Sequence, residues 1–241
     1  MTFDSATGTS GPAAKIRSPV TMKQRRFRRE ALRFRLVARP PERIMGHTAP
    51  TRTSLHPLLA ARWSPYAYDP TRDLQPHQLR ALLEAAVWAP SKANSQPWRF
   101  LVGRRGDATF KAIFDALAPE NQVWAGNAAA LVVGVAQTVS EAGHPNSHAA
   151  YDLGQAMAQL TVQATAEGLF VHQMARFDPD RVRAAFNIPA GFDPYAVAAI
   201  GYLGHPAELP DDLRKWEQAP RVRRPLRETA FAGVWGHPAV D

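Results

Sequence analysis

The segment that most limits the possible folds of this chain is an apolar stretch near its middle. Residues 129–136 carry no polar side chain and include three valines, Val132, Val133 and Val135. A continuous apolar run of this length with β-branched residues predicts a buried strand. Shorter runs of the same kind predict further strands at 98–103, 169–174 and 195–203.

Segments with helical periodicity separate these strands. Pro76 and Pro179 stand at favoured first-turn positions, and Asp178 precedes Pro179 as an N-cap. Because helices alternate with short strands, the sequence predicts the α+β class with a mixed central sheet. Apolar spacing predicts the helices at 55–61, 76–88, 107–117, 120–126, 148–168 and 178–186.

The helix expected at 148–168 is the longest, and it is apolar nearly all round. Leu153, Met157, Leu160 and Ala164 form one stripe, and further apolar residues cover much of the remaining surface. A helix of this kind is buried, in the core or in a subunit interface.

The charge of the chain is concentrated at its N-terminus. Of the 29 Lys and Arg, 11 lie in residues 1–45, and of the 21 Asp and Glu, 3 lie there, which leaves 18 of each sign for residues 46–241. We therefore expect a disordered basic arm over 1–50 and a single neutral domain over 51–241, ending in a Pro- and Arg-rich tail.

Three interpretations of the arm are open. It binds nucleic acid or an anionic membrane surface, or it is a targeting peptide, or the native product starts downstream at Met45, which is the interpretation we favour. For the body we expect neither nucleic-acid nor membrane binding, because it is neutral and has no apolar run long enough to cross a bilayer. No secretory signal is visible, and a cytoplasmic location is expected.

Several site chemistries are excluded by what the sequence lacks. It has no cysteine, so disulfides, zinc-thiolate sites and cysteine nucleophiles are excluded. It has no Gly-rich dinucleotide or phosphate loop and no nucleophile elbow. His144, His148 and Asp152 have the spacing of metal ligands, but a solvated helix start is the better interpretation, and we expect no metal. Any redox chemistry would then come from a cofactor rather than from a catalytic side chain.

A polar loop joins the helix at 76–88 to the strand at 98–103. Pro90 ends the helix, and Ser91, Asn94 and Gln96 then offer hydroxyl and carboxamide groups without any carboxylate. We call residues 90–96 the central loop. Its composition suits a flat, neutral heterocycle with hydrogen-bonding edges.

Arginines at both ends of the body could hold a phosphate group. Arg62 and Ser64 precede the helix at 76–88, whereas Arg223 and Arg224, with Arg221 nearby, lie in the tail. Planar guanidinium groups form charge-assisted hydrogen bonds to phosphate oxygens, so the two sites together could form a clamp.

Four segments, taken together in their order along the chain, resemble the nitroreductase family of FMN-dependent oxidoreductases. The most specific is Ala-Pro-Ser-x-x-Asn-x-Gln-Pro-Trp at 89–98. The others are Arg-x-Ser at 62–64, Gly-Leu at 168–169 after a long helix, and Ala-Ile-Gly-Tyr at 199–202 with Arg-Pro-Leu at 224–226. The resemblance covers about residues 55–230.

The resemblance implies an intertwined homodimer with two FMN molecules at the subunit interface. Arg62 and Ser64 would contact the phosphate and the pyrimidine edge of the ring, and the central loop would lie along the ring and ribityl chain, partly from the partner subunit. The backbone at 173–175 would offer an N–H to flavin N5. The residues so assigned are Arg62, Trp63, Ser64, Pro90, Ser91, Asn94, Gln96, Asn121, Met174, Ala175, Arg223 and Arg224.

The implied activity is hydride transfer from NADH or NADPH through FMN to a nitroaromatic, a quinone or a similar electron-poor acceptor, in a ping-pong cycle. A flavin-dependent dehalogenase or a flavin-cleaving enzyme on the same fold is the alternative, because a fold does not determine a function. Outside the enzymes, the alternative is a nucleic-acid or membrane-surface binder acting through the basic arm.

The chain departs from the family pattern at one position of the implied site. Tyr66 stands where the family usually has a second basic residue, and Lys92 or Arg99 could supply that charge instead. Trp98 is expected in the core, and so is Trp124, for which stacking near the substrate is the alternative.

Overall fold

The computed structural model describes residues 47–51 and 53–240, which belong to one compact unit, Pro40–Asp241. The predicted basic arm, including the candidate start at Met45, lies almost entirely outside the described residues. The three interpretations of the arm therefore stay predictions.

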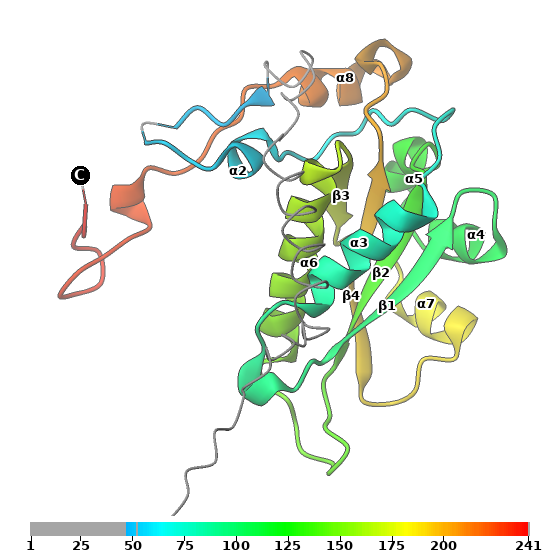
Figure 1. The fold of residues 1–241 in the computed structure, drawn as a ribbon, viewed down its shortest axis with the longest axis horizontal. Coiled ribbons are helices and arrows are strands. Elements are labelled where there is room, and N and C mark those ends of the chain that lie inside the picture. Colours follow the sequence, from blue (N-terminus) through cyan, green and yellow to red (C-terminus); the bar gives the residue numbers. More distant parts are fainter. Residues whose placement is uncertain (1–46, 52, 241) are drawn as a thin grey trace, which may run out of the picture. The chain divides into compact units, whose positions relative to one another are not determined.

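The centre of the described chain is a four-stranded sheet with the order β1-β2-β4-β3 (Figure 1). Every pair of neighbouring strands is antiparallel. The α+β class is confirmed, but the prediction of a mixed sheet is wrong for the described residues. Helix-containing connections join parallel and antiparallel strands alike, so the sequence pattern did not determine direction. The strands are β1 (Trp98–Arg104), β2 (Ala130–Gln137), β3 (Phe170–Met174) and β4 (Phe192–Gly201).

Strand β2 is buried on both faces, as its apolar composition predicts. Leu131 and Val133 belong to the hydrophobic cluster on one face of the sheet, and Ala130 and Val132 belong to the cluster on the other. Side chains alternate between the faces of a strand, so a strand in the middle of a helix-covered sheet must be apolar throughout.

Two groups of helices cover the two faces (Figure 1). One face carries α3 and α6, which also pack against each other, and the other carries α4 and α7, with α5 packed beside α4. The helices are α3 (Pro76–Val87), α4 (Ala108–Asp115), α5 (Pro119–Ala125), α6 (Ala149–Ala166) and α7 (Pro179–Phe186).

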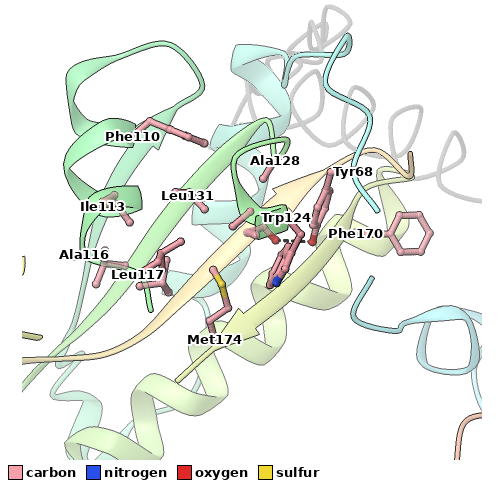
Figure 2. Packing of buried hydrophobic residues seen from close by; sticks show 14 of the residues in the cluster. Tyr68, Phe110, Ile113, Ala116, Leu117, Trp124, Ala128, Leu131, Phe170 and Met174 are labelled. Carbon is pink, nitrogen blue, oxygen red and sulfur yellow. Dashed lines mark hydrogen bonds between the residues drawn. The ribbon is translucent and has the colours of Figure 1, made fainter. Parts of the chain in front are cut away.

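Figure 2 shows part of the cluster beneath α4 and α5. Tyr68 and Trp124 stack with their rings 6.1 Å apart, and the Tyr68 hydroxyl donates to the Ala199 carbonyl of β4. Trp98 and Trp124 are both buried, which confirms their predicted core positions. Helix α6 buries one stripe only: Tyr151 on its open side is 67% exposed in the single chain.

The ends of the body contain two further helices, α2 (Pro57–Ala61) and α8 (Asp211–Gln218). The sequence predicted α2 but not α8, because α8 is mostly charged and buries a single residue, Glu217. Short 3₁₀ turns lie at Lys92–Asn94, Pro206–Glu208 and Leu226–Glu228. No helix among the described residues is long and apolar enough to span a membrane.

Candidate functional site

Arg62 and Ser64 lie in the turn that follows α2. The half-buried Arg62 donates from Nη1 to Ser64 Oγ at 3.3 Å. Trp63 between them points into the core, where it stacks on His47 at 3.8 Å and meets the edge of Phe170 at 6.2 Å. The buried indole fixes this turn, so the side chains on either side of it have defined positions.

Two arginines of the C-terminal segment lie near Arg62. Burial, followed by the positive charge of Arg223, lowers the pKa of Arg62. Burial, followed by the charges of Arg62 and Arg223, lowers the pKa of Arg221. We call Arg62, Arg221 and Arg223 the arginine cluster. The fold thus brings together residues about 160 positions apart, as the predicted clamp requires.

The arginine cluster has the character of an anion site. No carboxylate of the described residues pairs with any of its three guanidinium groups. Like charges held together without a counter-ion raise the free energy of the apo protein, and a phosphate would relieve that repulsion. Its donor set therefore fits the phosphate of FMN.

The three arginines differ in how many of their donors are engaged. Arg221 Nη1 already donates to the carbonyl oxygens of His47 at 2.6 Å and Ala60 at 3.0 Å. Arg223 donates only to the neighbouring Val222 carbonyl. Arg224 is exposed, and its place in the phosphate clamp stays a prediction. Arg62 and Arg223 are consequently the members best able to bind a ligand.

Trp63 carries an unusual buried donor. Its Nε1 is the one buried side-chain polar atom in the described part of the chain that has no hydrogen-bond partner. An unpaired buried N–H costs about 1–3 kcal/mol. Its position between Arg62 and Ser64 agrees with the predicted role of this turn in ligand binding.

The central loop has a strained backbone. Ala93, Asn94 and Gln96 all have positive φ angles, of 50°, 55° and 46°. Residues other than glycine rarely adopt this conformation, and such strain concentrates at functional sites. The loop exposes Asn94 and Gln96 to solvent, and Gln96 Nε2 donates to the Asn94 carbonyl at 3.2 Å, which leaves the Asn94 carboxamide and Gln96 Oε1 open to a ligand.

Two side-chain oxygens hold the loop in this shape, together with backbone hydrogen bonds from Asn94 to Ser91 and from Ser95 to Lys92. The buried carboxylate of Asp152 on α6 accepts from the Lys92 amide at 3.0 Å, and Ser91 Oγ accepts from the Gln96 amide at 3.0 Å. Sequence reasoning considered Asp152 only as a metal ligand and missed this role. A groove of about 560 Å³ adjoins the loop, lined by Leu83, Val87, Ser95, Gln96, Trp98, Arg99, Phe100 and Val102.

A third group of predicted residues lies where β3 ends. Asn121 on α5 donates from Nδ2 to the Arg176 carbonyl at 3.0 Å, which places it beside Met174 and Ala175. The Met174 side chain is buried in the core, so the backbone is the part of Met174 that a ligand could reach. Ala175 is exposed.

Tyr66 fills its position with aromatic packing. Its ring lies 4.8 Å from His172 and 5.4 Å from Trp124, measured between ring centroids. His172 donates from Nδ1 to the Pro65 carbonyl, and burial lowers the pKa of His172. Of the two candidate replacements for the missing cation, Arg99 donates from Nη1 to the carbonyls of Gln96 and Trp98. The side chain of Lys92 is exposed.

Within one chain, the central loop and the turn that carries Arg62 lie toward opposite ends of α6. The central loop is anchored at Asp152, near the start of α6. Trp63 instead contacts Phe170, which follows the end of α6. At that end, the Leu169 amide donates to the Ala164 carbonyl. The 12 residues from Asp152 to Ala164 span about 18 Å of helix. Gln173 near the end of β3 donates to Thr161 Oγ1 of α6 at 3.1 Å, so the end of β3 lies beside the middle of this helix. The turn that carries Arg62 lies toward one end of α6, and the central loop lies at the other end.

Comparison with known proteins gives a family match over much of the body. The model of the Nitroreductase family matches residues 59–202. A solved structure described as an oxidoreductase containing FMN is 34% identical, with a TM-score of 0.74, over 78% of this chain and 96% of that chain. A nitroreductase family protein from Clostridium difficile 630 shares the fold at 21% identity and a TM-score of 0.58, over 73% of this chain and 96% of that chain.

Two curated proteins are also similar in sequence. An uncharacterized 15.4 kDa protein in the ask 5′ region of Mycolicibacterium smegmatis is 40% identical over 148 residues, which are 58% of this chain and 99% of that protein. A protein of Thermus thermophilus named NADH dehydrogenase is 29% identical over 160 residues, which are 54% of this chain and 76% of that protein.

Proposed function

The chain belongs to the nitroreductase family, and from this premise we propose that it is an FMN-dependent oxidoreductase that uses NADH or NADPH. The 34% identical structure described as containing FMN supports the cofactor, and the Thermus relative named NADH dehydrogenase supports the electron donor. The acceptor would be an electron-poor ring such as a nitroaromatic or a quinone.

The observation that carries the proposal is the arginine cluster, three guanidinium groups with no described carboxylate among them. Arg62 and Arg223 would bind the FMN phosphate directly, and Ser64 would add its hydroxyl. Arg221, whose Nη1 is occupied by two carbonyls, would hold the C-terminal segment in place. Bound FMN would supply the redox chemistry, accepting a hydride at N5 and passing the reducing equivalents on in a ping-pong cycle.

We further propose that the site is completed by a second copy of the chain. The central loop and the arginine cluster lie at opposite ends of α6, so a homodimer that brings one copy's loop to the other copy's cluster would unite the predicted contacts. The open side of α6 carries the exposed Tyr151 and the small residues Ala150, Gly154 and Ala158, which would let a second chain approach the helix closely.

The visible absorption spectrum of the purified protein tests the function. We expect a yellow protein whose oxidised-flavin band disappears when NADH or NADPH is added without oxygen. A yellow protein that keeps its band with both donors would contradict the proposed electron source. A colourless protein that takes up no added FMN would contradict the cofactor assignment.

A further inference from the structure

Glu217 is a buried acid with an unusual set of partners. It is 3% exposed, although α8 around it is charged and open to solvent. Its two carboxylate oxygens accept from the backbone amides of Tyr66 at 2.7 Å and Ala67 at 3.3 Å. No described Lys, Arg or His forms an ion pair with it. Burying a carboxylate without a cation costs free energy. The hydrogen bonds from the Tyr66 and Ala67 amides offset part of that cost, which indicates a structural or functional role for this acid.

The position of Glu217 in the chain relates it to both halves of the arginine cluster. Tyr66 lies four residues after Arg62, on one half, and Glu217 lies four residues before Arg221, on the other. The carboxylate therefore joins the turn that carries Arg62 to the segment that carries Arg221 and Arg223.

A second connection lies on the other side of Arg62. Arg221 donates to the Ala60 carbonyl at 3.0 Å, two residues before Arg62. The turn from Ala60 to Ala67 is thus attached to the C-terminal segment at both of its ends, by Arg221 and by Glu217. Arg62 and Ser64 lie between these attachments, and Arg223 follows Arg221 by two residues. All three keep donors for a ligand.

We propose that Glu217 is a positioning residue for the phosphate of the cofactor: by fixing Tyr66 and Ala67 to α8, it holds Arg223 at binding distance from Arg62 and Ser64. The inference rests on the proposed function, because it assigns the phosphate of FMN to the arginine cluster. Glu217 itself does not contact the cofactor. Misplacing an otherwise intact group by about 1 Å can lower the rate of an enzymatic reaction roughly a hundredfold. A remote residue that positions a binding group therefore has a measurable effect.

The experiment compares FMN with riboflavin, which has the same ring but no phosphate, on the full chain. Dissociation constants for both are measured for the wild type, Glu217→Ala and Glu217→Gln. We expect Glu217→Ala to lower the preference for FMN over riboflavin roughly tenfold or more, since the phosphate contacts lose their geometry. Riboflavin affinity should stay close to the wild-type value. Glu217→Gln keeps one acceptor oxygen, so its preference for FMN over riboflavin should lie between those of the wild type and Glu217→Ala.

Two control variants separate positioning from general destabilisation. Asp211→Asn removes an acid from the first turn of the same helix, where it pairs with Arg214, without touching the Tyr66 turn. Ile113→Val weakens the core under α4 by about 0.5–1.5 kcal/mol. Both should keep the wild-type ratio of FMN to riboflavin affinity.

The outcomes distinguish this inference from the function on which it rests. If the wild type does not prefer FMN to riboflavin, the phosphate assignment itself fails. If the wild type prefers FMN and both Glu217 variants keep the full preference, Glu217 has only a structural role and the inference is overturned.

Hydrogen exchange of the unaltered protein gives a test that does not depend on the variants folding. FMN should slow exchange at the Tyr66 and Ala67 amides more than riboflavin does, because a bound phosphate would stabilise the segment that carries their acceptor. Equal protection of these amides by the two ligands would contradict the proposal.

Discussion

At the level of single residues, Arg62 has both the position and the free donors to bind a phosphate. Arg62→Ala should weaken FMN binding by about 1.5–3 kcal/mol, roughly ten- to a hundredfold, through the loss of charge-assisted hydrogen bonds. Fluorescence titration with FMN measures this. Arg80→Ala, which removes an exposed arginine from α3 outside the cluster, is the matched control and should leave the affinity unchanged.

The same substitution has a second consequence in the apo protein. Because Arg62 lies among like charges, its removal relieves repulsion, and the melting temperature without ligand should not fall. An Arg62→Ala protein that binds FMN as tightly as the wild type would contradict the phosphate assignment.

At the level of elements, the central loop stores strain that its ligand-binding shape requires. Ala93 has a φ of 50°, which glycine adopts without penalty. Ala93→Gly should therefore stabilise the protein by about 1 kcal/mol, or raise the melting temperature by roughly 2–4 °C.

A glycine in an ordinary helix is the control. Ala184→Gly in α7 should have the opposite sign, a loss of about 1 kcal/mol, because alanine is favoured there. Calorimetry of both variants checks the pair. If Ala93→Gly also lowers the melting temperature, the loop is not strained in the apo protein.

At the level of the whole molecule, the separation of the two candidate groups along α6 predicts a site shared between subunits. Arg62→Ala damages one half, and Asn94→Ala or Ser91→Ala damages the other. If two different copies build each site, co-expression of variants from the two halves restores wild-type FMN binding at about a quarter of the sites, since half of the dimers are mixed and each has one intact site.

Purification through two different tags isolates the mixed dimers, in which flavin should fill about half of the sites, one in each dimer. A site built within one chain would show no recovery, because every chain would carry a defect. The loop variant must first be shown to lose FMN by itself.

Much of the fold could be predicted because its signals are local. The apolar run of β2, the N-cap Asp178 of α7 and the prolines that start α3 and α7 each act within one or two turns of the chain. Helix α8 was missed since it lacks an apolar stripe, although the acids of its first turn and Lys215 in its last turn match the helix dipole.

The sequence by itself determined all four strands, every helix of the body except α8, and the motifs that carry the family resemblance, because propensity, capping and periodicity act between near neighbours. Only the tertiary structure decided that all described strands run antiparallel, that Arg221 lies near Arg62 and Arg223, and that the Glu217 carboxylate accepts from the Tyr66 amide. Such pairings join positions that lie far apart in the chain, and Tyr66 and Glu217 are separated by 151 residues. Contacts at this separation leave no periodic pattern in the sequence.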